Sequence, residues 1–236
     1  MARKNTVTRS AGAGSARGGE SRTALSKAPA HGHVRKAEAP PPPVCDLKPT
    51  VKARIFKKAC DLFYREGIHA IGVDTNAAEA GSNKMSLYRS FGSKDELVAE
   101  YLREQERMHW EWWDGVIAPH AGNPRLQLEA LFEAYASRSH VSKESFGCAL
   151  ANAAVEIREP EHPARAVILG YKGEIRRRLR ELAAAIPVAE PQALGDALTM
   201  LIEGGAMSTL TFGCKNSPLD HVDKAAKGLI AAFATA

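Results

Sequence analysis

The chain has 236 residues, of which 44% are apolar, 25% charged and 6% aromatic, and its net charge is +5. This composition is typical of a folded globular protein, and no run of apolar residues is long enough to predict a membrane-spanning helix. No apolar stretch of signal-peptide length follows the basic N-terminus, so we expect no secretion signal. The four cysteines, at positions 45, 60, 148 and 214, lie far apart without a C-x-x-C pair. This spacing argues against a zinc finger or a disulfide framework and favours a reducing, cytoplasmic setting.

The charge is unevenly distributed along the chain. Residues 1–44 carry a net charge of +6, residues 45–94 carry +4, and residues 95–236 carry −5. A basic front followed by an acidic rear indicates a polyanionic partner for the front. The charge distribution alone therefore distinguishes a basic N-terminal part of the chain from an acidic C-terminal part.

Residues 1–47 are predicted to form a disordered, basic, proline-rich tail. They contain few large apolar side chains, so nothing would offset the entropy lost on ordering them. The four consecutive prolines at 40–43 favour a stiff, extended spacer. Two interpretations stay open: a solvated tail without a specific role, or a basic arm that adds phosphate contacts.

A three-helix domain is predicted over residues 48–94. Apolar residues recur at three- and four-residue spacing between Ile55 and Phe63, which is typical of one buried helix face, and Gly67 is a stop signal. A short second helix is predicted over about residues 73–80.

A third short helix is predicted to begin after Asn83, a good N-cap, and to end at Gly92. The linker Ala80-Gly81-Ser82 allows a tight turn between helices two and three, which is typical of a helix-turn-helix. The third helix would expose short polar or basic side chains suited to the major groove. They are Lys84, Met85, Ser86, Arg89 and Ser90.

Residues 95–236 are predicted to form a helical second domain. Ser93-Lys94-Asp95-Glu96 is a capping box, from which a long helix should run to about residue 117. Further helices are predicted over 124–139, about 146–157, 162–185, 190–212 and 218–234. No segment alternates polar and β-branched residues, so the fold class is all-α with about nine helices.

Residues 77–97 read Ala-Ala-Glu-Ala-Gly-Ser-Asn-Lys-Met-Ser-Leu-Tyr-Arg-Ser-Phe-Gly-Ser-Lys-Asp-Glu-Leu and resemble the DNA-binding signature of the TetR family of transcriptional regulators. The resemblance implies that Tyr88 and Lys94 contact phosphates. It further implies phosphate contact by Thr75 and backbone or base contacts by Lys84, Ser86 and Arg89, while Met85 could touch a thymine methyl.

Two positions depart from the family's pattern. Asn76 stands where Ile or Val is usual, and Ser82 stands where Val is usual. A polar side chain buried at either position must find a partner or cost roughly 1–3 kcal/mol. We therefore expect a marginally stable DNA-binding domain or a shifted second helix.

The rear domain contains the aromatic residues and the thiol that could line an effector pocket, although a plain hydrophobic core would have the same composition. The candidate pocket residues are Trp110, Trp113, Phe132, Tyr135, Cys148, Asn152 and Tyr171. Cys148 could also act as a redox sensor. A metal site from Cys148, Glu156 and His162 matches no common ligand spacing, and no metal or cofactor is predicted.

Two further features of the rear domain bear on its partners. The basic residues Arg176, Arg177, Arg178 and Arg180 favour a solvated face over a second nucleic-acid site. The last two helices are rich in small residues, and the resemblance implies that they form the four-helix bundle of a dimer.

The sequence thus predicts a cytoplasmic homodimer that binds a double-stranded DNA operator, most simply a repressor released by a small apolar or aromatic effector. Two alternatives stay open. One is a redox-responsive regulator or activator of the same fold that uses Cys148. The other is a helical ligand-binding protein or enzyme without DNA binding.

Overall fold

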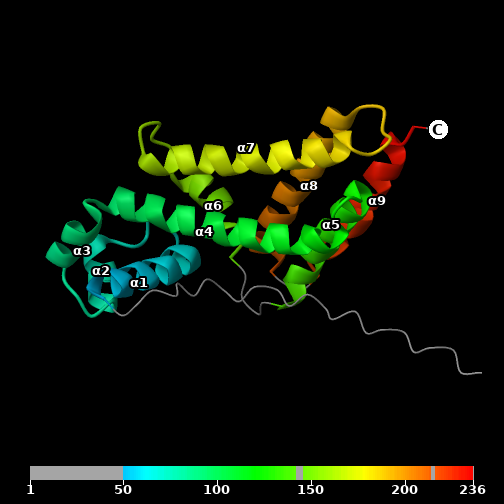
Figure 1. Cartoon of the computed structure of the whole chain (residues 1–236). Coiled ribbons are helices and arrows are strands. Elements are labelled where there is room, and N and C mark those ends of the chain that lie inside the picture. Colours follow the sequence, from blue (N-terminus) through cyan, green and yellow to red (C-terminus); the bar gives the residue numbers. More distant parts are fainter. Residues whose placement is uncertain (1–49, 142–145, 214–215, 236) are drawn as a thin grey trace, which may run out of the picture. The chain divides into compact units, whose positions relative to one another are not determined.

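The computed structural model describes residues 50–141, 146–213 and 216–235. Figure 1 shows these residues as helices joined by short connections. The predicted tail, residues 1–47, lies outside the described residues. The described part of the chain contains no strand, only an isolated bridge pair between Val188 and Ala234. The prediction of an all-α fold is confirmed.

Nine α-helices and two short 3-10 turns make up the described fold. The helices are α1 Val51–Glu66, α2 Val73–Glu79, α3 Lys84–Phe91, α4 Lys94–Ile117, α5 Pro124–Val141, α6 Ala149–Glu156, α7 Pro163–Ala184, α8 Pro191–Phe212 and α9 Val222–Phe233. The 3-10 turns are η1 Ala118–His120 and η2 Pro218–His221.

The first three helices form a small unit that we call the head. α1 begins at Val51 because the Thr50 hydroxyl accepts a hydrogen bond from the Ala53 N–H at 3.1 Å. α3 and α4 are capped in the same way by Asn83 and Ser93. Buried side chains of α1, including Ile55 and Phe56, pack against α2 and α3.

α4 connects the head to the remaining helices, which we call the rear bundle. Its first turns bury Leu97, Val98 and Tyr101, and α4 packs against α1 and α3 of the head and against α5, α6 and α7 of the rear bundle. Any displacement along α4 therefore involves contacts in both units.

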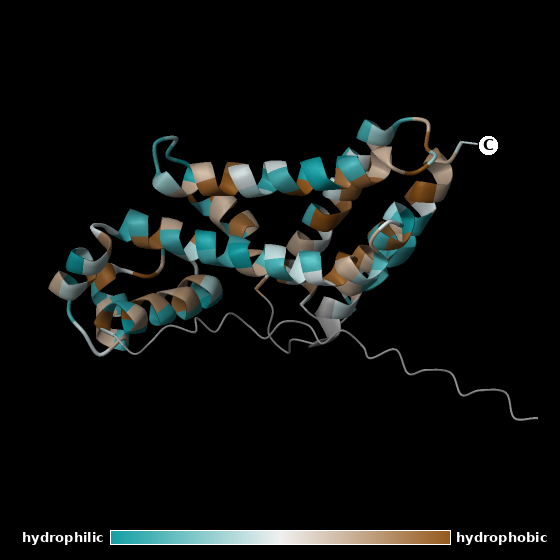
Figure 2. Cartoon of the chain, viewed as in Figure 1, coloured by the Kyte–Doolittle hydropathy of each residue, from teal (hydrophilic) through white to brown (hydrophobic). Residues whose placement is uncertain are grey.

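α7 and α8 form the closest helix pair in the rear bundle. A Cβ atom added to Gly195 of α8 would lie 2.6 Å from Cγ and 2.7 Å from Cα of Arg180 in α7. Only glycine permits this approach. α7 also packs against α4, and α9 packs against both α5 and α8. Figure 2 shows apolar and polar residues interspersed along α7, as expected for a helix with one buried face.

Most predicted helix boundaries agree with the structure to within a few residues, with two differences. The helix predicted over about 146–157 is shorter, because residues 146–148 are not helical, with Gly147 at φ +77°, and α6 begins at Ala149. The helix predicted over 218–234 is split, because η2 precedes α9 and His221, at φ −120°, ψ 11°, interrupts the helix.

Candidate nucleic-acid interface

The turn between α2 and α3 has the geometry that the sequence predicted. Gly81, with φ +59°, donates its N–H to the carbonyl of Ala78 at 2.9 Å, and the Ser82 N–H reaches the Ala77 carbonyl at 2.8 Å. A left-handed conformation at this position favours glycine. This turn thus sets the orientation of α3 relative to α2, and both helices pack against α1.

The outer face of α3 presents most of the predicted DNA-binding residues to solvent. Met85 is 70% exposed and Tyr88 is 38% exposed. Arg89 is exposed too, and within the described residues no hydrogen bond or ion pair engages its guanidinium. Large apolar groups and an unengaged guanidinium on one short helix are suited to base edges and thymine methyls.

The other two α3 candidates are less accessible. Ser86 and Ser90 are half-buried, and the Ser90 hydroxyl donates to the Ser86 carbonyl at 2.7 Å. Ser86 also donates its backbone N–H to the Asn83 side chain at 2.9 Å. Their hydroxyl oxygens can still accept or donate one further bond.

Thr75 and Lys84 lie where α2 and α3 meet at the surface. Thr75 is exposed in the first turn of α2. The ammonium group of Lys84 lies 3.2 Å from a carboxylate oxygen of Asp74, and both side chains are exposed. Exposed ion pairs of this kind contribute at most about 1 kcal/mol, so a phosphate can compete for the lysine.

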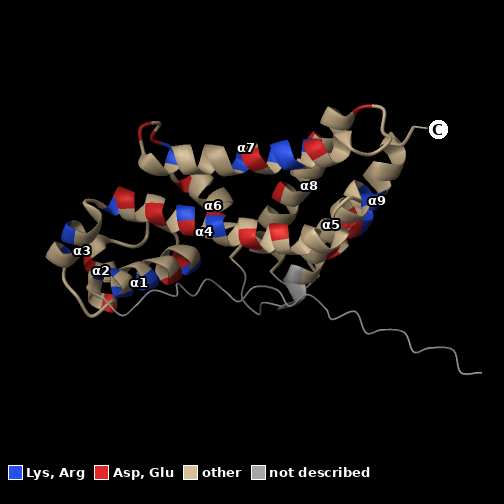
Figure 3. Ribbon diagram, in the orientation of Figure 1, with Lys and Arg blue, Asp and Glu red and all other residues tan. Residues whose placement is uncertain are grey.

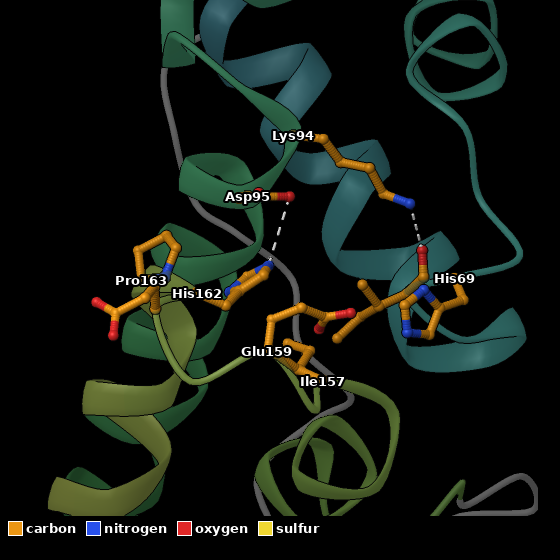
Figure 4. Close-up of a pocket in the computed structure, with 9 residues that line it drawn as sticks. His69, Lys94, Asp95, Ile157, Glu159, His162 and Pro163 are labelled. Carbon is orange, nitrogen blue, oxygen red and sulfur yellow. Dashed lines mark hydrogen bonds and ion pairs between the residues drawn. The ribbon is translucent and has the colours of Figure 1, made fainter.

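Lys94 lies apart from the α3 candidates and is turned toward the loop after α1. Its ammonium group donates to the Ile68 carbonyl at 2.7 Å (Figure 4). Burial lowers the pKa of Lys94, while Asp95 and Glu156 act in the opposite direction. An ammonium group has three donors, so two remain for another acceptor.

Asn76 is a buried polar residue of the head whose side chain is unsatisfied. It is only 1% exposed, and within the described residues neither its amide nitrogen nor its amide oxygen has a hydrogen-bond partner. Ser82, by contrast, is half-buried and not enclosed. Of the two departures from the TetR pattern, Asn76 is therefore the one expected to cost stability.

Five of the predicted pocket residues lie in one aromatic cluster of the rear bundle. His109 of α4, which the sequence pattern did not single out, is at its centre: its ring centroid lies 5.0 Å from those of Trp110 and Tyr171, 5.9 Å from Trp113 and 6.4 Å from Tyr135. Phe132 contacts Tyr135, with ring centroids 6.4 Å apart. The four-residue spacing between His109 and Trp113 was the available signal.

Cys148 is the N-cap residue of α6, and Asn152 lies one turn into that helix. The Asn152 amide donates to the Phe146 carbonyl at 2.6 Å, whereas its amide oxygen has no partner in the part of the chain that the structure describes. Burial raises the pKa of Tyr101 well above its usual value, and the nearby thiols of Cys60 and Cys148 add to this effect. Cys148 and Cys60 of α1 thus both lie near Tyr101, whereas Asn152 contacts the segment before α6.

The rear arginines are paired with carboxylates. Arg176 and Arg180 both bind Asp196 through two hydrogen bonds each, at 2.6–2.8 Å. Arg177 and Arg178 bind Glu174, and Arg178 binds Asp114. Figure 3 shows acidic and basic residues interspersed along α4 and α7. This pairing favours a solvated, self-neutralised face over a second nucleic-acid site.

A cavity of about 420 Å³ lies between the head and the start of α7 (Figure 4). It is lined by Ile68, His69, Lys94, Asp95, Ile157, Glu159, Glu161, His162 and Pro163. His162, considered with Cys148 as a metal ligand, instead lies 3.4 Å from Asp95 and accepts the Ala164 N–H through Nδ1. Over the described ranges, no three His, Cys, Asp or Glu side chains are grouped to hold a metal ion.

This combination of a helix-turn-helix head and a larger helical bundle defines a class of DNA-binding regulators. The family described as "Bacterial regulatory proteins, tetR family" matches residues 55–101. The HTH-type transcriptional repressor SCO4008 of Streptomyces coelicolor is 37% identical over 93 residues, which are 34% of this chain and 47% of that protein. The match to this curated relative therefore spans about half of its length.

Solved structures extend the similarity to the rear bundle. The TetR-family transcriptional regulator SCO4454 from Streptomyces coelicolor is 26% identical, with a TM-score of 0.68 over 78% of this chain and 96% of that chain. A transcriptional regulator from Rhodococcus sp. Rha1, RHA1_ro04179, shares the fold at 19% identity, with a TM-score of 0.61 over 78% and 96%. The head thus matches the DNA-binding region of the TetR family, and the described fold is similar to that of a TetR-family transcriptional regulator.

No helix in the described ranges is long and apolar enough to cross a membrane.

Proposed function

We propose that this protein is a cytoplasmic homodimer that binds a double-stranded DNA operator through the head and represses transcription until a small effector binds the rear bundle. The observation that carries the proposal is the exposed α3 face, which presents Met85, Tyr88 and Arg89 on a rigid helix-turn-helix. In the proposed complex α3 enters the major groove. Lys84, Lys94 and Thr75 bind the flanking phosphates, which set register without reading sequence.

Dimerisation is supported by the outer face of α8 and α9. Met200 is 68% exposed, Met207 is also exposed, and Gly204 lies between them at helical spacing. A Cβ added to Gly204 or to Gly228 of α9 would meet no described atom within 4 Å. A glycine on the exposed face of a helix destabilises that helix, whereas the same glycine facing a second copy of the chain allows the two helices to pack closely. Two-fold pairing would place two heads about 34–36 Å apart, one turn of DNA.

Effector binding is supported by the aromatic cluster around His109. The indole N–H of Trp113 and the amide nitrogen of Gln105, two turns earlier on α4, are buried without hydrogen-bond partners among the described residues. An aromatic effector with an acceptor atom would satisfy such donors. Because α4 joins this cluster to the head, differential binding to two positions of α4 would alter the separation of the heads.

Selection of duplexes from a random DNA library by the full chain tests the proposal. We expect a near-palindromic sequence to be enriched and its binding to weaken steeply with salt. Tyr88→Ala combined with Lys94→Ala should weaken binding to the selected duplex. Arg177→Ala, which removes a basic residue paired within the rear bundle, is the control and should leave binding intact.

The alternatives give different results in the same experiment. Failure to enrich any sequence favours a helical ligand-binding protein or an enzyme. Enriched binding that is lost under peroxide in the native chain and retained in Cys148→Ser favours the redox-responsive regulator. A reporter gene placed behind the selected sequence separates a repressor from an activator.

A further inference from the structure

α6 is a short helix whose last residue and whose preceding segment, residues 146–147, both contact residues 64–69, at the end of α1 and just beyond it. Its buried face, Ala149, Leu150 and Ala153, belongs to the hydrophobic core. The polar contacts at its two ends are separate from that core and come from residues more than 80 positions away in sequence. They join a rear element directly to the head without passing through α4.

The C-terminal end of α6 is held by two hydrogen bonds from one residue. A carboxylate oxygen of Glu156 accepts the backbone N–H of His69 at 2.8 Å, and the Glu156 carbonyl lies 2.8 Å from Nε2 of the His69 ring. Since a carbonyl only accepts, that ring nitrogen must carry a hydrogen. The imidazole thus caps a carbonyl at the end of the helix.

Gly67 makes this contact possible. Its φ is +92°, and an added Cβ would lie 3.3 Å from the Glu156 carboxylate. The backbone conformation favours glycine, and a larger residue would also crowd the Glu156 carboxylate. The Glu156 carboxylate is therefore seated directly on the turn that ends α1.

The N-terminal end of α6 is held by Tyr64. Its hydroxyl donates to the Gly147 carbonyl at 3.0 Å and accepts the Phe146 N–H at 3.3 Å. Its ring meets that of Phe146 edge to face, with centroids 5.6 Å apart. The segment before α6 is thus attached to the last turn of α1.

The same segment touches α8 on its other side. Gly147 has φ +77°, and an added Cβ would lie 3.1 Å from the Leu210 side chain and 3.3 Å from the Ala206 carbonyl. Residues 146–148 therefore lie between α1 and α8. A movement of α8 or α6 toward this segment would press on Tyr64.

The polar groups in the cavity beside this contact complete the connection between head and rear. Lys94 holds the Ile68 carbonyl, and His162 at the start of α7 faces Asp95 (Figure 4). The loop between α1 and α2 is therefore held from α4 and from α6. If this loop moves together with α4, its contact to α6 is strained, and if it moves with α6, its contact to α4 is strained.

We propose that Tyr64 and Glu156 form a two-point clamp that fixes α6 to the end of α1, so that displacement of α6 moves the head through α1 as well as through α4. Both are positioning residues. A single contact would act as a pivot, whereas two contacts on either side of an eight-residue helix transmit rotation as well as translation.

Hydrogen exchange of the full chain, followed by mass spectrometry on residues 64–72 and 146–157, tests the clamp without DNA. We expect Glu156→Ala to raise exchange at both segments by about ten-fold or more, including residues 146–148 at the far end. Tyr64→Phe, which keeps the ring and removes the hydroxyl, should likewise raise exchange at residues 67–69. Glu156→Gln keeps an acceptor oxygen and should remain within about three-fold of the native chain.

The matched control is Glu133→Ala, which removes a carboxylate bound to Lys227 at 2.6 Å between α5 and α9. It should leave both segments unchanged. If each clamp variant loosens only its own end, or if Glu133→Ala loosens both segments equally, there is no clamp. Because these outcomes involve no DNA, they are distinguishable from failure of the proposed function.

A second measurement uses the duplex selected as described above and rests on the proposed function. In Tyr64→Phe and Glu156→Ala, preference for that duplex over a scrambled one should fall by about ten-fold, since head placement is loosened. Non-specific affinity, which is set by charge, should be unchanged in Tyr64→Phe and should not fall in Glu156→Ala, which removes a negative charge. Equal weakening for both duplexes would contradict a positioning role.

Discussion

Within the described residues, the clustered arginines of the rear bundle are paired with carboxylates, whereas the basic residues on the exposed face of the head are not or are paired only at the surface. In the rear, Arg176 and Arg180 share Asp196, and Arg177 and Arg178 share Glu174. In the head, Arg89 on α3 has no carboxylate partner among the described residues, and Lys84 has only an exposed one. A run of arginines in sequence therefore does not locate a polyanion site. A polyanion site is indicated instead by basic side chains that have no carboxylate close enough to pair with them.

The largest expected effect separates these two kinds of arginine. Arg89→Ala should weaken binding to the selected duplex by at least about 30-fold, because removing a base-reading side chain from each of two heads costs roughly 1–3 kcal/mol per head. Arg177→Ala should leave affinity unchanged. Fluorescence anisotropy titrations at one fixed salt concentration measure both variants, and equal weakening would erase the distinction between head and rear.

The next effect tests packing in the rear bundle. Gly195→Ala should lower the free energy of unfolding by about 1–3 kcal/mol, since the new methyl group would overlap the backbone of Arg180. Gly170→Ala on α7 is the matched control, because an added Cβ there meets no described atom within 4 Å. It should stabilise the chain by up to about 1 kcal/mol. Denaturant unfolding measures the free energy of unfolding of the two variants. A change of the same sign in both would contradict the close approach of α7 and α8 at Gly195.

Stability of the head is tested at Asn76. Asn76→Ile should raise the free energy of unfolding by about 1 kcal/mol or more and the Tm by about 2 °C or more, because an unsatisfied buried amide is replaced by apolar contact. Asn76→Ala, which removes the amide but leaves space, is the control and should gain less. An unchanged or lower Tm in Asn76→Ile would mean that the amide is satisfied.

The smallest effect concerns acid. Hydrogen bonds from Arg177 and Arg178 lower the pKa of Glu174 to about 2. A carboxyl group with a lowered pKa stabilises the fold above its unfolded pKa, and that stability is lost as the pH falls from about 4.5 to about 2. Because these side chains are partly solvated, Glu174→Gln should remove less than about 1 kcal/mol of the change in unfolding free energy over this pH range. Glu66→Gln on α1 is the control, and an equal change there would contradict the assignment.

Local signals in the sequence were sufficient for most of the fold. The Ser93 hydroxyl accepts the Glu96 N–H at 3.0 Å, as the capping box predicts, and Asn83 caps α3. The apolar stripe from Ile55 to Phe63 is buried. These features depend on residues three or four positions apart, so periodicity and capping chemistry reveal them.

Contacts between distant residues could not be predicted in the same way. Tyr64 reaches Gly147 and His69 reaches Glu156 across 83 and 87 positions, and nothing local to either residue signals its partner. Pairing of Arg180 with Asp196 likewise depends on how α7 and α8 are placed. The sequence suggested that Asn76 would be buried, but only the structure shows that both of its polar atoms lack partners among the described residues.

The most direct test of sequence reading by the head is the ratio of affinities of the full chain for the selected duplex and for a scrambled duplex of equal length and charge, at physiological salt. If α3 reads bases, the native ratio should be at least about 1,000. Arg89→Ala should reduce it, because the loss of a base-reading side chain weakens binding to the selected duplex more than the loss of one charge weakens binding to the scrambled duplex. A native ratio near one, or a ratio that Arg89→Ala leaves intact, would contradict the claim that the head reads DNA sequence.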